Sequence, residues 1–477
     1  MPSTHLDIRN IPAEVHHGLL DLQRRLELPT SFSAEVLADA ELAAQLPPTE
    51  HVDRTDIEFV TIDPESSTDL DQALQIERDG DGYLVRYAIS DVAHFVRPGT
   101  ALEEETHRRG QTFYAPSARV PLHPSVLAEG AASLLADGVP RPAMLWEHRL
   151  DSAGELRGVT LTRALVLSRA KLNYDGVQRD LDRGEPHPSI ALLPEVGELR
   201  RQLEIQRGGV SLNLPEQEIL EHDGTWQLEF RSLVPVEDHN AQISLLTGFA
   251  AARIMLDGAV GILRTLPPAE QWSLEKLRRA AATLGVAWPK SMGYPEFVRS
   301  LSPDNPRELA VLTRCTMLFR GAGYLAFDGA VPDEHLEHSA LAAPYAHTTA
   351  PLRRLVDRYV LEVCHALLNG VEVPQWARDG LDALPAEMAD SGRLARAYEN
   401  GVLDLAEALV LRGAMGRVLT GVVTDVHPKT GVGTLQVPDP AVELRVKASQ
   451  KEVGSEIRVR VDKVDVRSGR VTLSRPN

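Results

Sequence analysis

The stretch TIDPESSTDLDQAL, from Thr61 to Leu74, places four acidic side chains beside apolar ones. Carboxylates this close repel one another unless a positive charge lies between them. The residues that lead into it, DIEFVTID, alternate as a half-buried strand does, so we expect a strand that ends at Asp63. A PESST turn follows, and Asp69 and Asp71 then lie on one side of the chain if the backbone is extended. A hairpin with RDGDG as its turn would leave these carboxylates at strand ends beside a sheet.

Three interpretations of this acidic stretch differ in their chemistry. Most aspartate-rich turns are solvated loops, and this one alone does not exclude that. A calcium-binding EF-hand loop is excluded, because Thr68 replaces its glycine and Leu74 its final glutamate. Carboxylate oxygens with few other ligands suit Mg²⁺ or Mn²⁺, which leave room for water and a phosphate group. A site of this third kind hydrolyses phosphodiesters.

A second stretch, HSALAAPYAHTTAPLRRLVDRYVLEVCHALL at residues 338–368, contains two adjacent arginines. Thr348 or Thr349 is expected to cap a helix with Pro351 in its first turn. Arg353 and Arg354 would then lie near the positive end of that helix, where paired guanidiniums form a phosphate clamp. The alternative is two arginines in surface ion pairs.

Together the two stretches resemble the catalytic RNB domain of the RNase II/RNase R family of 3′-to-5′ exoribonucleases. The family's T-I-D-x5-D-x-D-D-A stands here as TIDPESSTDLDQA, and its H-F-G-L-A-L-x-x-Y-x-H-F-T-S-P-I-R-R-Y as HSALAAPYAHTTAPLRRL. Between them, in family order, lie ISDVAHFV, TFYAPSARVPLHP and LSRAKLNYDGVQ. The resemblance covers residues 32–411.

The resemblance implies a catalytic centre at the acidic stretch. Asp63, Asp69 and Asp71 resemble the ligands of Mg²⁺, for which Mn²⁺ can substitute, and Asp71 also orients the attacking water. Gln72 takes the fourth acidic position, and its carbonyl oxygen can still ligate the ion without adding charge. Arg353 resembles the arginine that grips the scissile phosphate.

Further residues are implied to contact RNA. Arg354 is the neighbour or alternate of the phosphate-gripping arginine, and Glu399 resembles the catalytic-site glutamate near the 3′-terminal nucleotide. Tyr114 resembles an aromatic residue on which a base stacks, and Tyr174 one close to the ribose that favours RNA over DNA. Near DGAVGILR, where the family often has a stacking phenylalanine, the sequence offers Val260.

The chain is expected to have an α+β fold with three domains. Residues 1–50 form a small helical domain, either helix-turn-helix-like or a plain packing element, in place of the family's cold-shock domains. Residues 51–411 form the mixed α/β catalytic RNB domain. Residues 416–477 alternate as about five short strands, which predicts an OB-fold barrel that either binds RNA or is purely structural. This tail has 11 Lys and Arg against 7 Asp and Glu, although the whole chain has a net charge of −18.

These features lead us to expect a Mg²⁺-dependent, processive 3′-to-5′ exoribonuclease that hydrolyses single-stranded RNA to nucleoside 5′-monophosphates. Some activity on structured RNA with a 3′ overhang is also expected. The alternative is an RNB-fold RNA-binding protein whose activity is weak or lost through Gln72, and a metal phosphatase fits the carboxylates but not the other motifs. Two cysteines and no long apolar segment suit the reducing cytoplasm, away from membranes. A monomer is expected.

Overall fold

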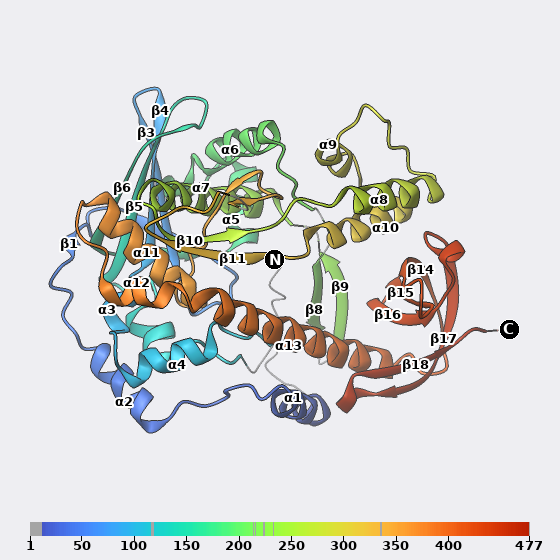
Figure 1. Cartoon of the computed structure of the whole chain (residues 1–477). Coiled ribbons are helices and arrows are strands. Elements are labelled where there is room, and N and C mark those ends of the chain that lie inside the picture. The colour runs from blue at the N-terminus through green and yellow to red at the C-terminus, as the bar shows by residue number, and fades with distance from the viewer. Residues whose placement is uncertain are drawn as a thin grey trace.

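A mixed seven-stranded sheet forms one side of the molecule, at the left in Figure 1. The computed structural model describes residues 12–115, 119–212, 214, 216–222, 225–231, 233–333 and 336–476. The sheet has the order β1-β6-β5-β4-β3-β2-β7, in which β1 pairs with β6 and β2 with β7 in parallel, and the other pairs are antiparallel. Its strands are β1 (Val52–Asp53), β2 (Phe59–Ile62), β3 (Gln72–Asp79), β4 (Gly82–Ser90), β5 (Arg141–Leu150), β6 (Leu156–Val166) and β7 (Ser168–Leu172).

The hairpin of β3 and β4 follows the alternation of the sequence. Leu74 pairs with Tyr87 and Ile76 with Val85, and all four side chains are buried. Gly80 at the tip has a φ of 62°, a conformation that glycine adopts without steric cost. The hairpin expected around RDGDG is therefore confirmed, and it fixes the position of the acidic residues just before β3.

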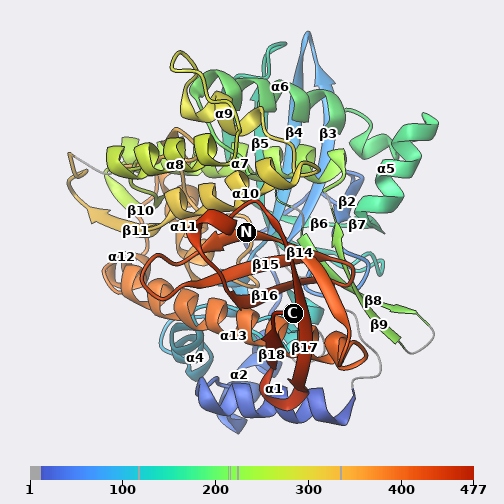
Figure 2. The ribbon, with the colours of Figure 1, turned by 90° about the vertical axis from the view of Figure 1, so that its right-hand side faces the viewer.

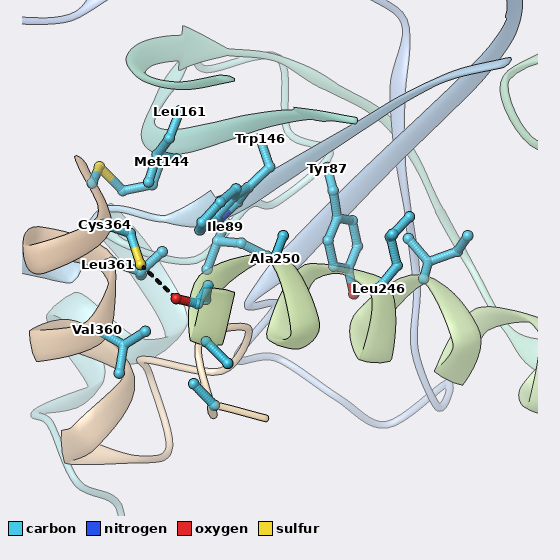
Figure 3. Close-up of a cluster of buried hydrophobic side chains, with 14 of the residues drawn as sticks. Tyr87, Ile89, Met144, Trp146, Leu161, Leu246, Ala250, Val360, Leu361 and Cys364 are labelled. Carbon is cyan, nitrogen blue, oxygen red and sulfur yellow. Dashed lines mark hydrogen bonds between the residues drawn. The ribbon is translucent and has the colours of Figure 1, made fainter. Parts of the chain in front are cut away.

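Two helices, α7 (Pro235–Asp257) and α11 (Leu355–Leu368), cover one face of the sheet. Figure 3 shows this packing, in which large side chains of the strands meet small and branched side chains of both helices. The thiol of Cys364 donates to the carbonyl of Ala251 across the two helices, at 3.7 Å. Because α11 begins directly after the two arginines, this packing holds them against the end of the sheet. The labelled residues are Tyr87, Ile89, Met144, Trp146, Leu161, Leu246, Ala250, Val360, Leu361 and Cys364.

Other helices and short sheets surround this core. Of the helices in the described ranges, none is long and apolar enough to cross a bilayer. The helices are α3 (Val92–Phe95), α4 (Ala101–Arg109), α5 (Tyr174–Arg183), α6 (Leu193–Arg207), α8 (Gln271–Thr283), α9 (Tyr294–Arg299), α10 (Pro306–Cys315) and α12 (Gln375–Leu381). The two-stranded sheets are β8 (Glu216–His222) with β9 (Thr225–Arg231), β10 (Val260–Thr265) with β11 (Gly323–Asp328), and β12 (Glu337–His338) with β13 (Ala343–Pro344).

A curled five-stranded sheet of order β16-β15-β14-β17-β18 ends the chain. Its apolar side chains alternate inward along each strand, as the sequence predicted. Helix α13 (Leu384–Arg412) runs from the central body to this barrel (Figure 1). The strands are β14 (Val418–Val426), β15 (Val432–Pro438), β16 (Ala441–Lys447), β17 (Glu456–Asp465) and β18 (Arg470–Ser474).

The two N-terminal helices attach to different parts of the molecule. Helix α1 (Ala13–Arg25) packs against α13 and the short turn η5 (Val466–Ser468) of the barrel. Helix α2 (Ala34–Ala43) packs against α4 instead, and Ser33 caps it as expected, accepting from the N–H of Val36. Residues 1–11 of the expected N-terminal domain lie outside the described residues. The three-domain division stays a prediction, but α1 and α2 have separate neighbours rather than one common core.

Candidate active site

Strand β2 delivers Asp63 to the end of the sheet. All four residues of β2 are buried, and the N–H of Asp63 continues the pairing by donating to the carbonyl of Leu172, at 3.1 Å. Lys171, on the neighbouring strand, donates to the carbonyls of Glu65 and Ser67, at 2.6 Å each. The loop after Asp63 is therefore held in place by a side chain from β7.

Asp69 and Asp71 flank a fully buried leucine and have different partners. The N–H of Leu70 donates to the hydroxyl of Ser133, at 2.9 Å. Asp69 accepts from the Nη1 of Arg119 at 2.8 Å and, more weakly, from the hydroxyl of Tyr114 at 3.4 Å.

The Oδ1 of Asp71 accepts from the backbone N–H of Leu352, at 2.7 Å. This bond ties the acidic loop directly to the segment that carries the two arginines. The sequence separates the two segments by almost 300 residues, and the resemblance alone connected them.

Burial makes the negative charge of two of these carboxylates costly. It raises the pKa of Asp63 to about 7, with Asp69 adding to the shift and Arg353 opposing it. Burial also raises the pKa of Asp71 well above its usual range, again against the influence of Arg353. Neighbouring cations therefore compensate these carboxylates only in part.

The two arginines precede helix α11 rather than lying inside it. The helix begins at Leu355, so the expectation that Thr348 or Thr349 caps it is wrong. The N–H of Ala350 donates to Asp357 and that of Leu352 to Asp71, at 2.7 Å each, and these bonds hold residues 350–354 as a turn.

Arg353 and Arg354 differ in their hydrogen bonding and in the exposed fraction of their side chains. Both side-chain oxygens of Asp357 accept from Arg354, at 2.9 Å each, and 23% of the Arg354 side chain is exposed. The Arg353 side chain is 42% exposed, and its Nε lies 3.7 Å from the Oδ2 of Asp71. Arg353 is therefore the arginine that can reach a phosphate group beside the carboxylates.

Gln72, the expected fourth metal ligand, bridges strand β3 and the arginine loop in this structure. Its Oε1 accepts from the hydroxyl of Tyr87 at 2.5 Å, and its Nε2 donates to the carbonyl of Thr349 at 2.7 Å. Both ends of the amide are thus used within the protein, because Gln72 begins β3 where that strand meets the arginine loop.

The remaining expected RNA-binding residues lie in a loop and on two helices. Tyr114 is half-buried beside Asp69, as described above, while Tyr174 begins α5 and accepts from the amide of Asn240 at 3.3 Å. Glu399 lies on α13, where burial raises its pKa and Arg396, one turn away, opposes the shift. Val260 is buried in the core at the start of β10, so it offers no surface for a base.

Arg119 and Lys171 are parts of the site that sequence reasoning missed. Both occur inside stretches that carry the resemblance, SARVPLHP and SRAKLNY, but their charges carry no signal of a partner. Lys171 reaches the acidic loop because β7 pairs in parallel with β2, with Thr61 opposite Lys171. Such a pairing joins segments that are far apart in the chain, and no local pattern reveals it.

The donor set suits a hard divalent cation. Carboxylate oxygens are the ligands that Mg²⁺ and Mn²⁺ prefer, and the pKa values of two of the three carboxylates here are raised by desolvation. Within the described residues, no three His, Cys, Asp or Glu side chains are already gathered as a cage for an ion. The residues therefore fit such an ion by their chemistry, with one oxygen of Asp69 already accepting from Arg119.

A mixed sheet that holds buried carboxylates beside an exposed arginine, followed by a β-barrel, defines the class of RNB-type proteins. The RNB domain model matches residues 51–370, and that of the RNase II-type exonuclease C-terminal S1 domain matches residues 417–475. The first match covers more than half of the chain, so the chain belongs to the RNB family. This confirms the family and the α+β architecture expected from the sequence.

Two curated relatives are both named Ribonuclease R. The protein of Escherichia coli (strain K12) is 31% identical over 327 residues, which cover 64% of this chain and 39% of that protein. The protein of Aquifex aeolicus is 25% identical over 447 residues, which cover 88% and 62%. The chain thus spans between 39% and 62% of the length of these relatives.

Solved structures show the same fold at low sequence identity. Mycoplasma genitalium RNase R in complex with ribose methylated single-stranded RNA has a TM-score of 0.86 at 18% identity, covering 97% of this chain and 78% of that one. Yeast Ssd1, a pseudonuclease, has a TM-score of 0.70 at 15% identity, covering 94% and 57%. At these identities the likeness establishes the fold alone.

Proposed function

We propose that the chain is a 3′-to-5′ exoribonuclease that hydrolyses single-stranded RNA to nucleoside 5′-monophosphates. The observation that carries this proposal is the placement of Arg353 beside Asp71, with Asp71 fixed by the N–H of Leu352. Membership of the RNB family and the Ribonuclease R relatives support the same activity.

Asp63, Asp69 and Asp71 would hold the divalent ion, Mg²⁺ or in its place Mn²⁺. When bound, such an ion activates water and stabilises the leaving oxygen of a phosphodiester. Arg353 would bind a non-bridging oxygen of the scissile phosphate as an ion pair. The bond from Leu352 leaves the second oxygen of Asp71 to orient the attacking water, which adds to phosphorus while the bond to the 3′ oxygen breaks.

The other expected residues would hold the strand. Tyr114 would stack on a base, Tyr174 would lie near the ribose, and Glu399 near the 3′-terminal nucleotide, with Arg354 supporting Arg353 through Asp357. Stacking and backbone contacts recur at each register of the strand, which makes degradation unspecific and processive. The barrel, with its excess of Lys and Arg, would guide single-stranded RNA toward the site.

We also propose that the chain degrades structured RNA from a long 3′ overhang, acting as a cytoplasmic monomer. A Mycoplasma genitalium RNase R solved with double-stranded RNA, at 18% identity and a TM-score of 0.83, supports this extension. Digestion that halts well before the duplex on overhangs of every length would contradict it.

The test compares the parent protein with Asp71→Asn on a 5′-labelled single-stranded RNA and Mg²⁺. Asparagine keeps the oxygen that accepts from Leu352 but removes the charge, so RNA binding should persist while hydrolysis falls by several orders of magnitude. Asp390→Asn, at an exposed position of α13, is the matched control and should keep parental activity. Near-normal hydrolysis by Asp71→Asn would remove the metal-site assignment, and intact RNA with the parent at every Mg²⁺ and Mn²⁺ concentration would favour an RNA-binding protein.

A further inference from the structure

Arg119 is a third guanidinium at the carboxylates, beside the two that the sequence singled out. Its backbone is anchored because the next residue, Val120, exchanges two backbone hydrogen bonds with Phe113, at 2.8 and 2.9 Å. Its Nη1 donates to Asp69 at 2.8 Å and its Nη2 to the hydroxyl of Thr68 at 3.0 Å. The guanidinium therefore contacts the acidic loop from a residue next to this backbone pair.

The same guanidinium has a second acidic partner on its other side. The Nη2 of Arg119 also contacts the carboxylate of Glu129. The side chain of Glu129 is 36% exposed, whereas that of Asp69 is 12% exposed. If Arg119 leaves Asp69, it still has a carboxylate to pair with, so its charge is never stranded.

Asp69 and Asp71 differ in how closely a cation contacts them. Asp71 faces Arg353 at 3.7 Å, which is longer than a hydrogen bond, and its other oxygen accepts from a backbone N–H. Asp69 is instead directly paired with a cation. A divalent ion that takes Asp69 as a ligand competes with Arg119 for that carboxylate, because the two positive charges repel one another.

We propose that Arg119 is an exchangeable counter-ion of Asp69: it competes with the divalent ion for this carboxylate, and Glu129 holds it aside when the ion binds. This inference rests on the proposed metal site and adds a control of ion affinity to it. It predicts opposite effects for two neighbouring residues. Removing the arginine tightens ion binding, and removing Glu129, which draws the arginine away from Asp69, weakens it.

The experiment titrates Mn²⁺ into the full chain by isothermal calorimetry, without RNA. Arg119→Gln should lower the dissociation constant for Mn²⁺ by about two- to fivefold, and Glu129→Gln should raise it by a similar factor. Arg149→Gln is the matched control, because it removes one positive charge far from the carboxylates. Arg149 forms an exposed ion pair with Asp79 near the tip of the β3–β4 hairpin. The dissociation constant of Arg149→Gln should equal that of the parent.

Thermal melting of each variant checks that it is folded, and Arg119→Lys gives a second test of the arginine. Lysine keeps the charge but cannot form the forked contact, so it should bind Mn²⁺ more tightly than the parent and less tightly than Arg119→Gln. Equal or weaker binding by both Arg119 variants overturns the counter-ion role, while loss of binding in Asp71→Asn would leave the metal site standing. If the parent and every variant bind no Mn²⁺, the metal site and this inference both fail.

Discussion

Gln72 joins the acidic strand β3 to the loop that carries Arg353. Its amide accepts from the buried Tyr87 hydroxyl and donates to the carbonyl of Thr349. Gln72→Ala would leave both groups without this partner, and we expect a loss of about 1–3 kcal/mol in the free energy of unfolding. Because the arginine loop loses its tie, hydrolysis should fall as well, but by less than in Asp71→Asn.

Urea unfolding of Gln72→Ala, Tyr87→Phe and the double variant measures this bridge. The two substitutions should be coupled by about 0.5–1.5 kcal/mol, since each removes one partner of the same hydrogen bond. Gln75→Ala, three residues along the same strand, is the control for loss of an amide whose hydrogen bonds, with Arg86 and Glu77, stay within the β3–β4 hairpin. Strict additivity of the two variants would show that the bridge is not formed in solution.

Tyr114 is expected to decide where degradation stops. If a base of the retained strand stacks on its ring, Tyr114→Ala loses about 1–3 kcal/mol of binding free energy for short products. These products then dissociate before the next cut, so the end product on a sequencing gel becomes longer. Tyr114→Phe keeps the ring and loses only the 3.4 Å contact with Asp69, so its end product should match the parent's. Identical end products for all three proteins would assign Tyr114 to packing.

At the scale of elements, the local sequence patterns predicted the strands, turns and caps that depend on neighbouring residues. The strand before Asp63, the RDGDG turn and the Ser33 cap each depend on residues close together in the sequence, and the structure has all three. The half-buried alternation expected for that strand is wrong, because β2 lies between β3 and β7 inside the sheet and all four of its residues are buried. The start of α11 was misplaced, because the N–H groups of Ala350 and Leu352 are taken by Asp357 and Asp71. A long-range partner such as Asp71 decides a helix boundary that capping rules assign from neighbours alone.

The packing of β5 against α7 buries His148, whose pKa is lower in the folded chain than in the unfolded chain. His148 stacks on Trp146 with ring planes 9° apart, and its Nε2 lies 3.1 Å from the hydroxyl of Thr247. Burial, aided by Arg200, lowers the pKa of His148 to about 3. Below the ordinary value of about 6.5, the unfolded chain binds a proton that the folded chain does not. Stability from this residue is therefore complete above pH 6.5 and is lost as the pH falls.

We expect the contribution of His148 to decrease by about 1.4 kcal/mol per pH unit between about pH 6 and pH 4. The His148→Gln variant cannot take up that proton, so its free energy of unfolding should fall less steeply with pH than the parent's. Urea unfolding at several pH values gives both slopes. His16→Gln, at an exposed position of α1, is the control. Parallel slopes for the parent and His148→Gln would mean that this histidine is protonated equally in both states.

At the scale of the whole molecule, α1 fastens the barrel to α13. Figure 2 shows α1 below strands β17 and β18 of the barrel, and the three segments share one hydrophobic cluster. The side chains Asp21 and Arg467 form an ion pair at 2.6 Å between α1 and the barrel. The sequence did not predict the hydrophobic cluster or this ion pair, because α1 and the barrel lie at opposite ends of the chain.

Two glycines allow α1, α13 and the barrel to pack closely where they meet. An added methyl group at Gly18 would lie 2.8 Å from the carbonyl oxygen of Arg467 and 2.8 Å from Leu405, and one at Gly401 would lie 2.6 Å from Leu22. Contacts this short force the neighbouring segment to move. The orientation of the barrel relative to the body therefore depends on small residues at the crossing of α1 and α13.

We expect Gly18→Ala to loosen the barrel without touching the proposed active site. Alanine favours a helix over glycine by about 1 kcal/mol, but the contact with the Arg467 carbonyl opposes this, and overpacking costs about 1–3 kcal/mol. Gly392→Ala is the matched control, since its methyl group would meet only the flexible end of Arg396, at 3.8 Å. That variant should be as stable as the parent or more stable, whereas Gly18→Ala should unfold at a lower urea concentration.

The functional readout separates the barrel from the site. Gly18→Ala should bind long single-stranded RNA more weakly, with a flatter dependence on salt, because fewer phosphate-facing Lys and Arg of the barrel are engaged at once. Hydrolysis of a saturating short oligonucleotide should match the parent's, since the carboxylates and Arg353 lie in the central body. Limited proteolysis should cut Gly18→Ala near residues 412–417, between α13 and β14, sooner than Gly392→Ala. If the two glycine variants show equal stability, equal affinity for long RNA and equal cleavage, then α1 does not set the position of the barrel.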